Sequence, residues 1–239
     1  MSVAIRVVAA GAAAALAVRV VRSRRRRFLH PAGRSFEAEF EFEAGLESRA
    51  GFESGAGFEF EAGGRYPATV RVSKGAGTRG GRLDVRGLAI RVHLPEGDLD
   101  LLLSTSGTGP LTRHLPAPRR TFDTFYGSIT AYRIGGRKVY LTATGVGAGD
   151  SLAGLAEEDS FRLGMLRDDI ELPFGRVRLG AALPADADAG LAFNPVLNSL
   201  PELHPTGLIH GVRAFAYRAS QRWRRVPSFE LSRQGARRT

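Results

Sequence analysis

Phenylalanine and glutamate alternate early in the chain, and this pattern restricts the possible folds more than any other feature of the sequence. The string FEAEFEFE occupies residues 36–43, and a shorter string, FEFE, occupies residues 58–61. Successive side chains of a β-strand point to opposite faces, so such a strand places its rings on one side and its carboxylates on the other. Residues 36–60 are therefore predicted to form strands with one buried and one solvated face.

Other stretches follow the same logic along the chain. Further strands are predicted at residues 69–73, 88–94, 99–103 and 172–182, and residues 128–133 and 138–144 flank Gly135-Gly136, a pair that favours a tight hairpin. Helices are expected near residues 4–21, 151–168 and 207–224. Strands joined by short turns indicate an antiparallel sheet or barrel, so the predicted fold class is α+β, mainly β.

Charge is distributed unevenly along the 239 residues, whose formal net charge is +10. Residues 1–34 contain eight arginines and no acidic residue, and residues 212–239 contain eight arginines against one glutamate. The chain has almost no lysine and no recognisable nucleic-acid-binding motif, so we expect no nucleic-acid partner. It also has no cysteine, which excludes disulfides, thiolate ligation of haem and zinc–thiolate sites.

The amino-terminal residues 3–21 are rich in alanine and valine but are interrupted by Arg6 and Arg19. The apolar run between these arginines is short for a membrane span, and most of the charge follows it, unlike in a secretory signal. We expect a helix that packs on the domain or lies on a membrane surface, with the body of the protein in the cytoplasm. The predicted divisions are residues 1–26 (helix or arm), 27–206 (barrel) and 207–239 (helix and basic tail).

Near the carboxyl end, Arg213 stands four residues before Tyr217, and Arg222 and Arg224 follow. On a helix this spacing places the guanidinium of Arg213 beside the phenol of Tyr217 and returns Arg224 to the same face. A nearby cation lowers the pKa of a phenol, and metal coordination lowers it further. The same spacing also fits an amphipathic helix with solvated arginines.

The string resembles the proximal haem motif of the catalase family, Arg-x-x-x-Tyr followed by Arg-x-Arg, and other stretches follow in catalase order. Residues 27–30 resemble the segment that ends in the distal histidine, and residues 36–40 resemble the strand after it. Residues 66–73 and 84–92 resemble the core strands, and residues 192–195 resemble the Ala-Phe-x-Pro segment ahead of the tyrosine helix. The resemblance covers about residues 27–225 and implies a reduced catalase: an antiparallel β-barrel, an N-terminal helix and a C-terminal proximal helix.

This resemblance implies haem b as the cofactor. Catalases use tyrosine as the axial ligand of the haem iron, so Tyr217 would be the metal ligand, with Arg213 beside it. Arg27, Arg71 and Arg224 fall where the family places arginines near the haem propionates, and a planar guanidinium is well suited to bind a carboxylate.

The resemblance also implies a set of catalytic residues. His30 would stand over the other face of the haem and move a proton between the two oxygens of peroxide, and Ser73 would orient its imidazole. Thr105 lies closest by count to a catalase asparagine and would donate a hydrogen bond to bound peroxide. The residues that follow, 107–120, contain three prolines where catalases are rich in phenylalanine, which implies a more open pocket.

These features predict a catalase-related haem peroxidase that reduces hydrogen peroxide or organic hydroperoxides. Two alternatives stay open: rearrangement of fatty acid hydroperoxides, as in the allene oxide synthase relatives of catalase, and a barrel that binds haem or lacks it and has no turnover. By analogy with catalases, a homo-oligomer is expected.

Overall fold

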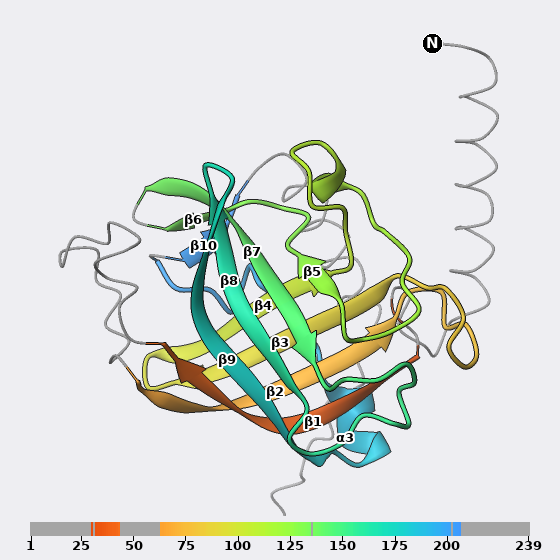
Figure 1. The fold of residues 1–239 in the computed structure, drawn as a ribbon. Coiled ribbons are helices and arrows are strands. Elements are labelled where there is room, and N and C mark those ends of the chain that lie inside the picture. The colour runs from red at the N-terminus through yellow and green to blue at the C-terminus, as the bar shows by residue number, and fades with distance from the viewer. Residues whose placement is uncertain (1–29, 31, 44–62, 135, 202, 207–239) are drawn as a thin grey trace, which may run out of the picture.

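The computed structural model describes residue 30 and residues 32–43, 63–134, 136–201 and 203–206. These residues form ten strands, a short 3-10 turn η1 (Thr112–His114) and one short helix, α3 (Ala185–Gly190) (Figure 1). The strands are β1 (Ala32–Phe42), β2 (Arg65–Lys74), β3 (Arg86–Leu94), β4 (Gly97–Ser104), β5 (Phe125–Gly127), β6 (Tyr132–Ile134), β7 (Arg137–Val146), β8 (Ser160–Arg167), β9 (Ile170–Ala182) and β10 (Leu203–Pro205).

Eight of the strands close into an antiparallel barrel. Around the barrel the order is β7-β5-β4-β3-β2-β1-β9-β8, and the pairing of β8 with β7 completes the circle. The short strands β6 and β10 extend the sheet from β7, outside this circle. The predicted antiparallel barrel is therefore confirmed.

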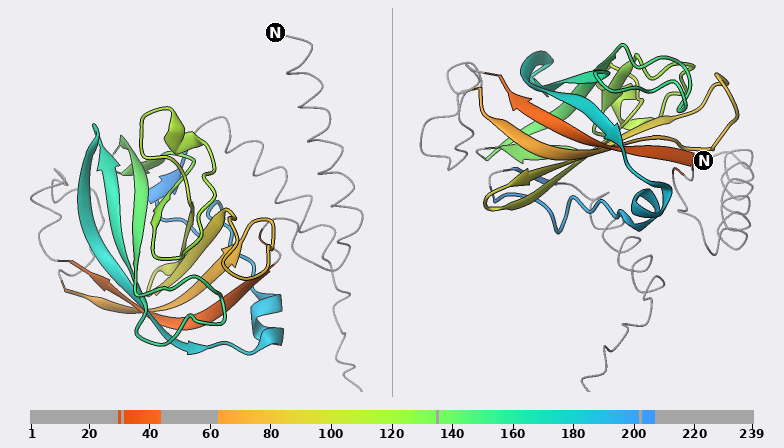
Figure 2. Two further views of the ribbon diagram at one scale, coloured as in Figure 1. Left: turned by 45° about the vertical axis from the view of Figure 1, so that its right-hand side comes forward. Right: turned by 90° about the horizontal axis from the view of Figure 1, so that it is seen from below.

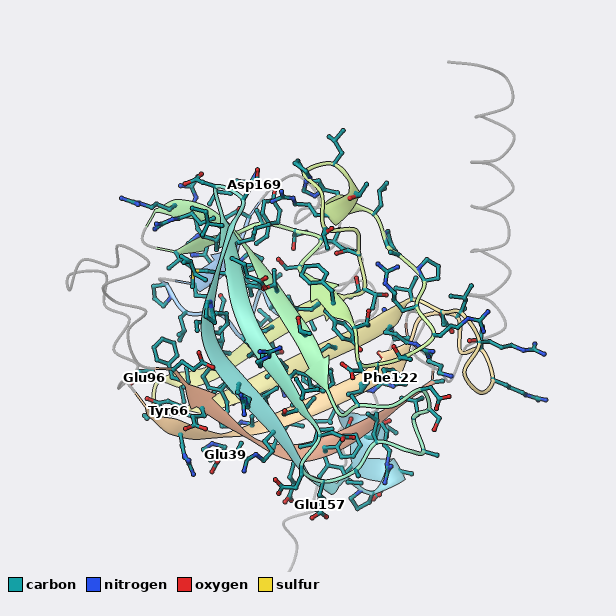
Figure 3. All side chains as sticks on the ribbon, in the orientation of Figure 1. Glu39, Tyr66, Glu96, Phe122, Glu157 and Asp169 are labelled. Atoms are coloured by element: carbon teal, nitrogen blue, oxygen red, sulfur yellow. The ribbon has the colours of Figure 1, made fainter. Side chains whose placement is uncertain are left out.

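Alternation along each strand builds the barrel core. In β1, Phe36, Phe40 and Phe42 are buried, whereas Glu37 and Glu39 on the other face are exposed, as the phenylalanine–glutamate pattern predicted. Figure 3 shows Glu39 on the outside of the barrel wall. The other strands add buried aliphatic side chains to the same interior. Burial of this apolar surface favours folding by about 25 cal/mol for each Å² removed from water.

The strand register places a second set of residues on the outer face of β1, β2 and β3. Gly33 of β1 lies opposite Ser73 of β2, and Ser73 lies opposite Gly87 of β3. In the same way Ser35 lies opposite Arg71. Because side chains alternate, these residues point away from the phenylalanine core and toward one region outside the barrel wall.

The chain after β9 covers this outer face (Figure 2). Helix α3 begins soon after β9 ends, and the residues that follow are held by Asp100 of β4, which is 1% exposed. Its carboxylate accepts hydrogen bonds from Arg91 at 2.7 and 2.8 Å, from the backbone N–H of Asn194 at 2.5 Å and from the side chain of Asn198 at 3.0 Å. The segment that resembles catalase Ala-Phe-x-Pro is thereby fixed to the barrel wall.

Two secondary-structure predictions need correction. The helix expected at residues 151–168 is wrong, because residues 160–167 form β8, in which Phe161, Leu163 and Met165 alternate into the core and the backbone pairs with β7 and β9. The strand expected at 128–133 is wrong for residues 128–131, because β5 ends at residue 127 and β6 begins only at residue 132. The hairpin through Gly136 is confirmed, because Ile134 pairs with Arg137.

The predicted helices at residues 4–21 and 207–224 lie outside the described residues, as does the second FEFE string. Within the described ranges, no helix has the length and apolar character that a membrane crossing requires.

Candidate active site

His30 and Ser73 come together at the outer face of β2, although 43 positions separate them in the sequence. The Nδ1 atom of His30 lies 3.1 Å from the hydroxyl oxygen of Ser73. His30 adopts a left-handed backbone conformation with φ of 58°, which histidine tolerates better than most non-glycine residues. The predicted orientation of this imidazole by Ser73 has the expected geometry.

A second hydrogen bond determines the tautomer of His30. The Ser73 hydroxyl donates to the carbonyl oxygen of Gly87 at 3.3 Å, and a hydroxyl has only one hydrogen to donate. The Ser73 oxygen must then accept its other bond from His30, which assigns the ring proton to Nδ1. This assignment, inferred from the network, leaves the lone pair of the neutral imidazole on Nε2, where it can accept a proton.

Gly87 makes room for this pair of side chains. A Cβ atom at position 87 would lie 2.5 Å from His30 Nδ1, 2.6 Å from its Cε1 and 2.6 Å from Ser73 Oγ. No side chain larger than hydrogen therefore fits without displacing the imidazole. Sequence reasoning assigned no role to Gly87; the available signal was a glycine at the start of a predicted strand, a residue type that often marks close approach of another group.

Arg71 places a buried cation beside His30. It is 5% exposed, and its Nη1 and Nη2 atoms both donate to the backbone carbonyl of His30 at 3.3 Å. Gly33 allows this position, because a Cβ there would lie 2.4 Å from the guanidinium carbon. Burial lowers the pKa of Arg71, while the adjacent Asp188 acts in the opposite direction. Arg71 remains a cation, since arginine loses its proton only at extreme pH.

Asp188 of α3 is the carboxylate that Arg71 binds. The Nε atom of Arg71 donates to Asp188 at 3.1 Å, and the hydroxyl of the fully buried Ser35 donates to the same carboxylate oxygen. Sequence reasoning missed Ser35 and Asp188. Only a buried arginine in β2 indicated that an anion was required, and nothing in the sequence spacing identified a residue 117 positions away.

Thr105 is fully buried and follows the last residue of β4. Its hydroxyl oxygen accepts a hydrogen bond of 3.0 Å from the backbone N–H of Arg86, and its carbonyl accepts one from Ala117 at 2.8 Å. The hydroxyl oxygen thus contacts the backbone of the strand beside the site, and a contact between this hydroxyl and peroxide stays a prediction.

A cluster of buried charges lies on the inner side of β2 and β3, next to the candidate site. Lys74 and Arg86 form a cross-strand pair and are 3% and 0% exposed. Burial is the main cause that lowers the pKa of Lys74 and of Arg86, and the charge of Asp84 acts in the opposite direction on both. Asp84 itself accepts bonds from the backbone of Ala76 and from Thr78. Burial raises its pKa, but these hydrogen bonds outweigh that effect and the pKa is lowered.

Four predicted site residues lie outside the described residues: Arg27, Arg213, Tyr217 and Arg224. In the described part of the chain, no group of three or more histidine and carboxylate side chains is arranged to hold a metal ion. The predicted iron ligand Tyr217 and the predicted propionate ligands Arg27 and Arg224 stay predictions.

The described residues fit one side of a haem site. His30 presents an oriented imidazole that can exchange a proton, and Arg71 supplies a buried guanidinium that already binds a carboxylate. Because haem carries two carboxylates and needs a proton-transfer group near its iron, these two neighbouring functions match its chemistry.

No family model matches the sequence, and no curated protein matches it. Solved structures do align with most of the chain, two catalases among them. A fungal catalase aligns with a TM-score of 0.62 at 14% identity, covering 88% of this chain and 61% of the catalase. A bacterial catalase aligns with a TM-score of 0.59 at 15% identity, covering 90% of this chain and 63% of the catalase.

At these identities the likeness establishes the fold, so the chain has a catalase-like fold, as predicted. The chain spans about three fifths of the length of each of these two catalases.

Proposed function

We propose, starting from the catalase-like fold, that this chain is a haem-dependent peroxidase that reduces hydrogen peroxide or organic hydroperoxides. The observation that carries the proposal is the hydrogen bond between Ser73 and His30, which holds an imidazole on the outer wall of the barrel beside the buried cation of Arg71. In the same place, Gly87 leaves room for the imidazole and Arg71 binds the carbonyl of His30, so three separate features hold this histidine.

Each residue of the proposed site would have a distinct task. Arg71, together with Arg27 and Arg224, would hold the propionates of haem, and Tyr217 would bind the iron. When bound, haem would supply the metal centre at which peroxide is reduced with electrons from a reducing substrate. The peroxide would lose a proton to Nε2 of His30, and the same imidazole would return a proton to the oxygen that leaves.

Ser73 would act as a positioning residue. Its hydrogen bond keeps the His30 proton on Nδ1, so Nε2 is the nitrogen that faces the reaction. Since the hydroxyl of Thr105 has a shorter reach than the carboxamide of the asparagine that catalases carry, rapid disproportionation of hydrogen peroxide is not expected, and we propose a peroxidase rather than a fast catalase.

Hemin binding and peroxide reduction test the proposal. The full chain, expressed with an adequate haem supply, should take up haem in a one-to-one ratio and show the absorption spectrum of a phenolate-ligated ferric haem, and Tyr217→Phe should change that spectrum. His30→Ala should retain haem but reduce peroxide more slowly by about two orders of magnitude, the usual scale for a general acid–base group. His93→Ala is the matched control, because His93 is a histidine on the outer face of β3 that is exposed and hydrogen-bonded to Asp98.

Several results would contradict the proposal. An unchanged spectrum in Tyr217→Phe would remove the tyrosine ligand, and an unchanged peroxide rate in His30→Ala would remove His30 from the mechanism. With a lipid hydroperoxide, epoxide rearrangement products instead of the alcohol would indicate the allene oxide synthase type of reaction. Failure to take up hemin would indicate a barrel without a haem function.

A further inference from the structure

The buried cation of Arg71 already has a carboxylate partner inside the protein. Asp188 lies 3.1 Å from Arg71 Nε, and its side chain is 20% exposed, against 6% for the side chain of Arg71. The buried Ser35 hydroxyl donates to the same oxygen of Asp188. The position in which Arg71 would bind a ligand carboxylate is therefore occupied by a residue of α3.

We propose that Asp188 fills the carboxylate position at Arg71 in the haem-free protein and must be displaced by a haem propionate, so that Asp188 limits the affinity of the site for carboxylate-bearing ligands. This inference rests on the haem site proposed above. It adds a residue that determines affinity and a movement of α3 that accompanies binding.

Charge balance supports the displacement. One buried guanidinium neutralises one carboxylate, and Nη1 and Nη2 of Arg71 each donate a hydrogen bond to the carbonyl of His30. A second carboxylate brought to Arg71 would lie close to the charge of Asp188 in a region with little solvent, where repulsion between like charges is strong. Binding therefore requires that Asp188 moves away or becomes protonated.

The construction of α3 makes movement inexpensive. The helix has only six residues, and none of them is buried, so moving it exposes little apolar surface. The chain just before it is held independently, because the N–H of Leu183 donates to the carbonyl of Ser35 at 2.8 Å. The residues after the helix are held as well, because Arg91 donates to the carbonyl of Ala192 and the N–H of Asn194 donates to Asp100. Movement of α3 is thus confined to the short stretch between these two anchors, while β9 and the barrel stay in place.

The ligand chemistry provides a selective test. Hemin carries two propionates, whereas hemin dimethyl ester has the same ring and iron without the carboxylate charges. Asp188→Asn retains the size of the side chain and an oxygen that can accept from Arg71 and Ser35, but removes the competing charge. Asp186→Asn is the matched control, because Asp186 lies on the same helix and is exposed.

The expected results concern affinity and α3 dynamics, independent of turnover. Asp188→Asn should bind hemin about tenfold more tightly than the unmodified chain, the scale of one hydrogen bond to a charged group. It should bind the dimethyl ester with the same affinity as the unmodified chain. Ser35→Ala removes one hydrogen bond from Asp188 and should change hemin affinity in the same direction by a smaller factor. In the unmodified chain, hemin should accelerate amide hydrogen exchange in residues 185–191.

The outcomes separate this inference from the function on which it rests. Stoichiometric hemin binding with equal affinity in the unmodified chain and Asp188→Asn, or hydrogen exchange in α3 that hemin leaves unchanged, would overturn the role of Asp188 alone. An equal gain for hemin and its dimethyl ester would show that charge is not the cause and would also overturn it. Absence of hemin uptake in every variant would refute the proposed function and this inference together.

Discussion

Replacing Gly87 by alanine is expected to push the imidazole of His30 off its serine partner without changing any charged group. The added Cβ would lie 2.5 Å from His30 Nδ1 and 2.6 Å from Ser73 Oγ, whereas ordinary contacts begin at 3.4 Å. Each side chain must therefore retreat by close to an ångström. The bond between them is already 3.1 Å long, so a shift of that size takes it beyond hydrogen-bonding distance.

Gly87→Ala should change the stability of the protein and its peroxide rate, but not its hemin affinity. Forcing a methyl group into a packed position costs about 1–3 kcal/mol of unfolding free energy. A misplacement of about 1 Å in a catalytic group can lower the rate about a hundredfold. The atoms nearest to a Cβ at position 87 belong to His30 and Ser73 and not to Arg71, so hemin affinity should stay close to that of the unmodified protein.

Three measurements check this reasoning on Gly87→Ala. Urea unfolding of the haem-free protein gives the stability change, hemin titration gives the affinity, and the rate of peroxide reduction gives the catalytic effect. Gly190→Ala is the control, because no atom lies within 4 Å of a Cβ at that position and its stability should stay unchanged or rise by about 0.4–1 kcal/mol. Wild-type stability together with a wild-type peroxide rate in Gly87→Ala would refute the role of this glycine.

Two further predictions concern the surroundings of the site. Asp100→Asn should lower the unfolding free energy, measured in urea, by about 1–3 kcal/mol, because Arg91 loses its buried carboxylate partner and keeps only the more exposed Asp98 at 3.5 Å. An unchanged value would contradict the role of Asp100 in holding the chain after β9. The pKa of Asp84 is lower in the folded protein, so its stabilisation is present above about pH 4 and is lost as the pH falls through the folded pKa. The loss of stability between about pH 6 and about pH 3 should thus be smaller in Asp84→Asn than in the unmodified protein, and equal losses would contradict this assignment.

Local patterns in the sequence were sufficient for most of the barrel. The alternation in residues 36–42 predicted β1 and its buried face correctly, because a period of two is a property of the strand itself. The same reasoning failed at residues 151–168. There, alanines and leucines ahead of the strand resemble a helix. Backbone pairing of β8 with β7 on one edge and with β9 on the other decides for a strand, and these contacts are not contained in the residue pattern of 151–168 itself.

For the candidate site too, the sequence indicated some features and the tertiary structure alone decided others. His30, Arg71 and Ser73 were recognised from ordered motifs in the sequence alone, since each belongs to a short string with a recognisable residue pattern. Their mutual geometry, the space left by Gly87 and the carboxylate of Asp188 came only from the tertiary structure. Strand register and the path of the chain after β9 decide which distant residues meet, and these depend on contacts between segments that no local pattern encodes.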